Sequence, residues 1–214
     1  MEPEDWNRGL QGTRGTVPWL TVRPTSLKLK PKKTATVKYT IRVPRDATGE
    51  LRTQVFFTTE TPGQVTTRSR LGAIIYVGIQ GTEHIEATLT GLSAAYTATT
   101  PGVAQPDRLD LVVRIHNGGN VHLVPEGMFT IRDRQGHIVA TIPMPPGWGL
   151  LPGQEDAFHA VGSGIHLKPG SYTLDAQIFC GGDLRKPVNL TRSQSFTVTK
   201  TGELHLAPPQ VPDI

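Results

Sequence analysis

The sequence is poor in several kinds of residue, and each scarcity excludes a class of protein or site. Its 214 residues include one cysteine, Cys180, so an internal disulfide and a metal site built on paired cysteines are both excluded. No run approaches the roughly 18 consecutive apolar residues of a membrane-spanning helix. The acidic, polar start has neither a basic nor an apolar segment, so we find no secretory signal in it. We expect Cys180 to be a small core residue on a strand.

Glycine, proline and threonine are abundant instead. The chain holds 23 glycines, 18 prolines and 27 threonines. Glycine and proline break long helices, whereas β-branched threonine favours strands. Alternation of apolar and polar residues predicts strands over residues 25–31, 34–43, 51–59, 71–80, 85–92, 109–116, 128–134, 138–142, 157–161, 171–179 and 194–199. The sequence therefore predicts an all-β protein.

The spacing of these strands predicts two domains. Seven short strands after residue 84 match an immunoglobulin-like (Ig-like) sandwich, while the first segment has only four clear strands. We expect an incomplete N-terminal Ig-like domain over residues 1–81, a complete Ig-like sandwich over residues 82–200 and a Pro-rich tail over residues 201–214. The predicted fold is two tandem Ig-like β-sandwiches, the first truncated.

Several short segments carry a family resemblance. They are WLTVRP at residues 19–24, LKPKKT at 29–34, IRVP at 41–44, GELRTQVFF at 49–57, IIYVGI at 74–79, IHNGGNVH at 115–122, LPG at 151–153 and LKPGSY at 167–172. This series of strand and turn motifs resembles that of PapD-like periplasmic pilus chaperones and related two-domain bacterial proteins. It is similar, more distantly, to surface proteins that bind cell-wall-attached partners. Relatives have further strands before the first segment, so we hypothesise that the chain is truncated or mis-started at its N-terminus.

The resemblance implies a site for strand addition. Leu71, Ala73, Ile75, Val77 and Ile79 would share one face of a strand, and an unpaired edge there could pair with a partner strand. Pilus chaperones anchor a partner's terminal carboxylate with an Arg on the first strand and a Lys near the last. Here the candidates near the last strand are Arg68 and Arg70. The alternative, a central strand buried on both faces, stays open.

A few other residues are candidates for binding or chemistry. Trp148, in a Pro-Gly-rich loop, is a candidate surface contact, or else a lid over the end of the sandwich. His116 and His122 flank a turn, but zinc needs three or four convergent ligands, so we predict no metal site. No hydrolase, nucleotide-binding or metalloprotease motif occurs, so we predict no enzyme and no cofactor. Asp107 and Asp110 are expected to be solvated turn residues. Trp19 and Phe57 are expected core anchors of the first domain.

Charge is unevenly divided. Residues 1–81 carry 13 Lys and Arg against 6 Asp and Glu, whereas residues 82–214 carry 9 against 12. The basic half lacks the aromatic-rich segments of nucleic-acid binders, so nucleic acid is not an expected partner. We predict a monomeric, non-catalytic, extracytoplasmic chaperone-like or assembly protein, periplasmic or at the cell surface, which binds β-rich pilus or surface subunits. The alternative is a structural or adhesive surface module that binds cell-wall components or glycans.

Overall fold

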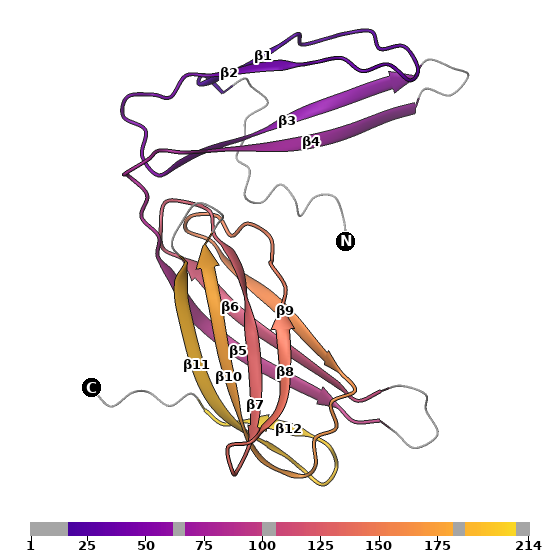
Figure 1. Cartoon of the computed structure of the whole chain (residues 1–214), viewed down its shortest axis with the longest axis vertical. Coiled ribbons are helices and arrows are strands. Elements are labelled where there is room, and N and C mark those ends of the chain that lie inside the picture. The colour runs from indigo at the N-terminus through magenta and orange to yellow at the C-terminus, as the bar shows by residue number, and fades with distance from the viewer. Residues whose placement is uncertain (1–16, 62–66, 100–105, 182–186, 209–214) are drawn as a thin grey trace. The chain divides into compact units, whose positions relative to one another are not determined.

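The computed structural model describes residues 17–61, 67–99, 106–181 and 187–208, and throughout these residues the chain forms strands and loops without a helix. The protein is therefore all-β (Figure 1). It divides into two compact units, which we call the N-terminal unit, residues 1–83, and the C-terminal unit, residues 84–214.

The N-terminal unit consists of two separate antiparallel ribbons. Its strands are β1 (Leu20–Arg23), β2 (Lys38–Ile41), β3 (Glu50–Thr61) and β4 (Thr67–Gly78). β1 pairs with β2, and β3 pairs with β4 over twelve residue pairs. Figure 1 shows the two ribbons as distinct layers of this unit. A complete sandwich needs more strands than this, because a two-stranded ribbon buries too little apolar surface to be stable alone.

The C-terminal unit is a closed β-sandwich. Its strands are β5 (Ala87–Thr97), β6 (Arg108–Asn117), β7 (Val124–Asp133), β8 (Ile138–Met144), β9 (Glu155–Ser163), β10 (Gly170–Gly181), β11 (Val188–Val198) and β12 (Leu204–Leu206). One sheet has the order β5-β6-β9 and the other the order β12-β11-β10-β7-β8. The first, second and fifth strands thus face the third, fourth, sixth and seventh, which is an Ig-like arrangement.

A single hydrophobic core fills the C-terminal sandwich. Along β6, the alternate residues Leu109, Leu111, Val113 and Ile115 are at most 1% exposed, so the period of two in the sequence matches the inward face. The neighbouring strand β9 contributes Phe158 and Ala160. The strands of the facing sheet contribute Phe129, Ile131, Ile142, Met144, Leu174, Ala176, Ile178, Cys180, Phe196 and Val198. Cys180 is fully buried, as predicted.

Some predicted strands differ from the observed ones. Residues 25–31 form no strand: the backbone N–H of Lys33 donates to Lys30 O in a turn, and the alternating residues there are exposed. The first strand, β1, lies before them and was not predicted. At the other end, β12 lies inside the expected tail, where it pairs with β11 over three residues. Short strands carry too few alternations to be recognised without their pairing partner.

Candidate functional site

The predicted binding strand is an edge strand. Within the part of the chain that the structure describes, β4 pairs with β3 alone, so its other edge has no strand partner. The interpretation of residues 71–79 as a central strand, buried on both faces, is therefore wrong. A row of unpaired backbone N–H and C=O groups on such an edge is a template for a further strand.

The apolar row on β4 becomes more exposed along the strand. Ile75 and Val77 are half-buried, whereas Ala73 is exposed and Leu71 is 72% exposed. Ile79 follows the strand, half-buried, and its backbone N–H donates to Gly49 O at 2.8 Å. The sheet register places Leu71 opposite Phe57, so the uncovered end is apolar on both strands. The row is thus open at one end of the ribbon.

The predicted carboxylate anchor lies on the other face of the ribbon. Arg70 is an even-numbered residue of β4, so it points away from the odd-numbered apolar row. Its guanidinium carbon lies 3.6 Å from the ring centroid of Phe56, a cation–π contact on β3. Arg68 belongs to β4, but its side chain falls outside the described residues. Arg70 is therefore already engaged with an aromatic ring.

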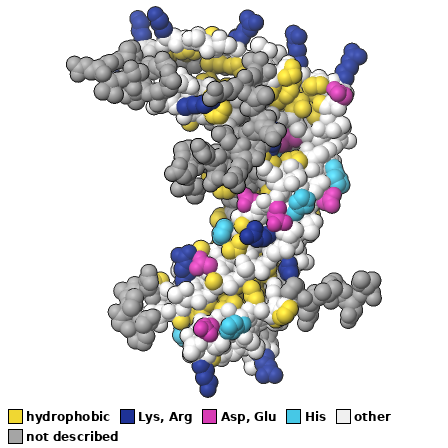
Figure 2. All heavy atoms as spheres, turned by 180° about the vertical axis from the view of Figure 1, so that it is seen from behind, with side chains coloured by type: hydrophobic (Ala, Val, Ile, Leu, Met, Phe, Trp, Pro, Cys, Tyr) yellow, Lys and Arg dark blue, Asp and Glu magenta, His cyan; other side chains and the backbone are white. Residues whose placement is uncertain are grey.

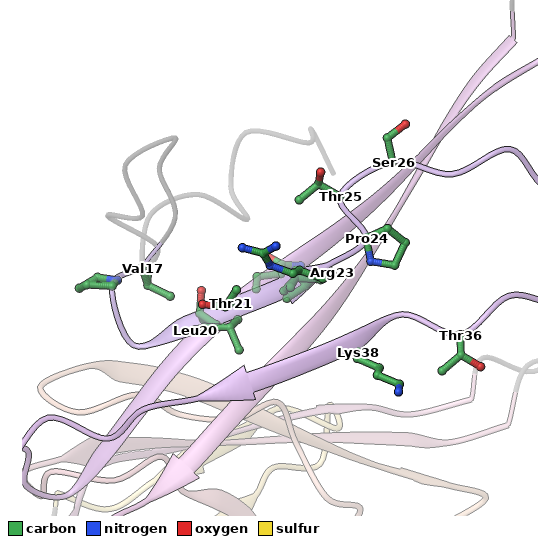
Figure 3. A pocket seen from close by; sticks show the side chains of 14 residues that line it. Val17, Leu20, Thr21, Arg23, Pro24, Thr25, Ser26, Thr36 and Lys38 are labelled. Atoms are coloured by element: carbon green, nitrogen blue, oxygen red, sulfur yellow. The ribbon is translucent and has the colours of Figure 1, made fainter.

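A groove of about 1290 Å³ separates the two ribbons of the N-terminal unit. Its walls are Val17, Pro18, Leu20, Thr21, Val22, Arg23, Pro24, Thr25, Ser26, Thr36, Lys38, Thr53, Gln54 and Val55 (Figure 3). The β1 wall runs over consecutive residues from Leu20 to Arg23, and the β3 wall over Thr53 to Val55. Lys38 of β2, which pairs with Arg23, lines the groove as well, so the groove borders both strands of this ribbon.

Among the described residues, β1 pairs on one side with β2, and β3 pairs on one side with β4. The groove is therefore enclosed by residues of both strands of the first ribbon on one side and by β3 of the second ribbon on the other. The sequence does not predict these groove residues, because the four-residue β1 is followed by Pro24 and gives no clear alternation.

The groove is electropositive. Arg23 lies directly opposite Lys38 in the β1–β2 register, and both line the groove. None of the other lining residues is acidic, and five of them carry hydroxyl groups. Within the residues described, neither Arg23 nor Lys38 forms an ion pair. Figure 2 shows further Lys and Arg side chains along the margin of this unit.

The N-terminal unit leaves most of its large apolar side chains in solvent. Its described buried apolar residues are Trp19 and Leu20, each 8% exposed. Its exposed ones are Leu27, Leu29, Tyr39, Val43, Phe56, Phe57, Leu71, Ile74 and Tyr76. The expectation that Phe57 is a core anchor is wrong, since it is 42% exposed.

In the C-terminal unit, Trp148 is the most exposed large hydrophobic residue, at 74%. It is therefore no lid buried against the sandwich. Across the ranges that the structure describes, no group of three or more metal-ligating side chains comes together. The Cys180 thiol has its pKa raised to about 11 by burial, so it is unreactive as a nucleophile.

Asp107 differs from the expectation of a solvated turn residue. It is 7% exposed, and it accepts hydrogen bonds from the backbone N–H of Thr99 and from His166 Nδ1 at 2.7 Å. The hydrogen bonds of Thr99, first from its side chain and then from its backbone, hold the pKa of the Asp107 carboxyl well below its usual range, aided by His166. Asp107 ties together the loops at one end of the sandwich, a structural role that its neighbours in sequence do not reveal.

The comparisons with known proteins show no family for this chain. No family model matches the sequence, and no curated protein matches it. Among solved structures, the chain is similar to one described as the ApaA protein of Bordetella pertussis, at 18% identity and a TM-score of 0.38. The match covers 52% of this chain and 92% of the other. So low a TM-score supports no argument about function. No helix in the described part is long and apolar enough to span a membrane.

Proposed function

We propose that the protein is a non-catalytic, extracytoplasmic assembly or chaperone-like protein, similar to the PapD-like chaperones, that binds β-rich partner proteins by strand addition. One observation carries the proposal: the described residues of the N-terminal unit form two ribbons with unpaired edges and exposed apolar side chains, whereas the C-terminal unit has a hydrophobic core of its own. A partner strand would satisfy the edge groups and cover the apolar side chains at once.

The test uses the full chain and two synthetic peptides of about 12 residues, longer than the usual strand of five or six. One alternates valine with polar residues, and the other is the same peptide with prolines that remove backbone donors. Hydrogen–deuterium exchange measures which amides each peptide protects. We expect the first peptide to protect amides of β1, β3 or β4, and the proline peptide to protect none. Equal effects of both peptides, or no protection in the N-terminal unit, would contradict strand addition.

A matched pair of variants locates the apolar contribution. Leu71→Asp replaces a side chain that is 72% exposed, so it leaves folding intact. Burying a leucine contributes about 1.5–3 kcal/mol, so its loss should weaken peptide binding by about tenfold or more. The control is Ile138→Asp on β8 of the C-terminal unit, where the side chain is 59% exposed. Equal weakening by both variants would show that Leu71 is not part of the site.

A second candidate function rests on Trp148. An exposed tryptophan can stack on a sugar ring, and at 74% exposure this side chain is accessible. The alternative is therefore a surface module that binds cell-wall glycans. It predicts a change in tryptophan fluorescence on titration with cell-wall polysaccharide, lost in Trp148→Ala, and no response to the strand-forming peptides.

A further inference from the structure

We infer that the outer face of the five-stranded sheet in the C-terminal unit is a sugar-binding site, and that it takes a chain of uncharged sugars. We call this surface the aromatic platform, and it consists of Glu126, Met128, Trp148, Gln177, Phe179 and Asn189. The inference rests on the second candidate function and deepens it, because an exposed tryptophan by itself specifies neither the surface nor the kind of sugar.

Strand pairing brings five of these residues together on one face. Phe179 on β10 lies directly opposite Glu126 on β7 and Asn189 on β11. Met128 follows two residues after Glu126 on the same face and lies opposite Gln177. The alternate residues of β10 are buried in the core, whereas Phe179 is 40% exposed and Met128 is 44% exposed. Figure 1 shows β11, β10 and β7 side by side, so the platform spans three neighbouring strands.

The loop that follows β8 brings Trp148 to the margin of the same face. Gly147 donates its backbone N–H to Pro125 O at 2.9 Å, and Leu123 and Leu150 exchange two backbone hydrogen bonds beyond it. The loop therefore runs beside the start of β7. A Cβ at Gly147 would lie 2.5 Å from the ring of a core phenylalanine, so Gly147 faces the core, whereas Trp148, the next residue, is 74% exposed and projects outward.

The platform side chains match the two surfaces of a sugar ring. A pyranose ring has an apolar face, and Trp148 and Phe179 offer flat apolar surfaces on which that face can stack. The rim of the ring carries hydroxyl groups. The amides of Gln177 and Asn189 can donate and accept hydrogen bonds there, while the Glu126 carboxylate accepts them. Among the described residues, these three polar side chains form no hydrogen bond or ion pair, so they can bond to a ligand without losing a protein partner.

The spacing of the two aromatic residues favours a chain of sugars over a single sugar. β7 lies between the loop that holds Trp148 and the strand that holds Phe179. The two backbones are therefore two strand spacings apart, about 10 Å. One pyranose ring is too small to stack on both aromatic rings at this separation, whereas different rings of one chain can do so.

Charge favours uncharged sugars. Glu126 is the only ionisable side chain of the platform. Further along the outer face, Arg132 pairs with Asp175 at 3.2 Å, so its charge is already offset. An anionic chain would meet the Glu126 carboxylate with no platform cation to offset the repulsion. A partner strand cannot add to this face either, because β7 and β10 each have neighbouring strands on both sides.

The experiment titrates the full chain with soluble oligosaccharides and measures affinity by calorimetry. The uncharged probes are oligomers of glucose, of xylose and of N-acetylglucosamine, and oligogalacturonate is the anionic counterpart. We expect at least one uncharged oligomer to bind. We expect its monosaccharide and oligogalacturonate to bind about tenfold more weakly or not at all, because the first reaches one aromatic ring and the second is repelled by the carboxylate.

Three variants and a control test the position of the site. Trp148→Ala and Phe179→Ala should each weaken binding about tenfold, because each removes one stacking surface. Phe179→Tyr keeps the ring and should bind as the unaltered chain does. The control is Val161→Ala on β9 of the other sheet, which removes an apolar side chain of similar exposure, 46%. Equal weakening by Phe179→Ala and Val161→Ala would overturn the assigned surface.

The outcomes separate the platform from the function on which it rests. Binding that requires Trp148 but not Phe179 would refute the platform and leave the second candidate function standing. Binding of none of the uncharged oligomers would refute both. Equal affinity for oligogalacturonate would refute the choice of uncharged sugars. Displacement of the bound sugar by the alternating valine peptide would show a protein-docking surface and overturn the inference.

Discussion

Asn117 is the buried polar residue whose removal should destabilise the C-terminal sandwich most directly. It is fully buried. Its side-chain Nδ2 donates to Val121 O at 2.8 Å and to Leu150 O at 2.9 Å, and its Oδ1 accepts from the N–H of Gly119 at 3.0 Å. The side chain thereby fixes the loop between β6 and β7 against the segment that precedes β9. The perturbation is Asn117→Ala.

The three hydrogen bonds of the Asn117 side chain contribute unequally to the free energy of unfolding. Leu150 O keeps a second donor, the N–H of Leu123 at 2.9 Å, after the substitution. Val121 is fully buried, so its carbonyl oxygen would be left without the Asn117 donor, which costs about 1–3 kcal/mol. Losing the other two bonds costs about 0.5–1.5 kcal/mol each. We expect a loss of about 3 kcal/mol in the free energy of unfolding, which moves the urea midpoint by about 1–3 M.

The single cysteine provides an assay that reports on this unit alone. Cys180 is fully buried in the C-terminal core, so it reacts with a thiol reagent only when that core opens. Brief labelling across a urea series gives the unfolding curve. Asn120→Ala is the control in the same loop, because the Asn120 Oδ1 accepts from His84 N at 2.7 Å in an exposed position. A midpoint shift for Asn117→Ala no larger than that of Asn120→Ala would refute the argument.

Two further predictions concern titratable groups. Because burial raises the pKa of the Cys180 thiol to about 11, a thiol reagent at mildly alkaline pH should label the native protein far more slowly than the urea-unfolded chain; equal rates would show that the core opens readily. Because the pKa of the Asp107 carboxyl is lowered in the folded state, its contribution to stability is present above the unfolded pKa of about 3.9 and is lost as pH falls through the lower folded value. Asp107→Asn should reduce the acid dependence of the urea midpoint while lowering stability at neutral pH, and an unchanged acid dependence would contradict this role.

The sequence by itself determined the all-β class, and in the C-terminal unit it determined the inward face of β6 and the turn that follows it. The alternation over residues 109–116 predicts an inward face, and its odd-numbered residues are the buried residues of β6. The Asn-Gly-Gly-Asn segment at residues 117–120 begins the loop after β6, as its composition predicts. A Cβ at Gly119 would lie 2.3 Å from His84 O, so the close approach of the two segments requires a glycine there. These are local properties, since side-chain alternation and backbone freedom depend on neighbours in the chain.

Only the tertiary structure decided which strand edges are unpaired and which side chains are covered. Alternation places Phe57 and Leu71 on one face of the ribbon. It does not predict that both side chains are exposed in the described structure. Asp107 resembles a solvated turn residue in sequence, and it is buried because Thr99 and His166 converge on it in space. The groove between the two ribbons of the N-terminal unit likewise depends on their pairing internally and not with each other. Strand pairing joins residues far apart in the chain, and no local pattern specifies it.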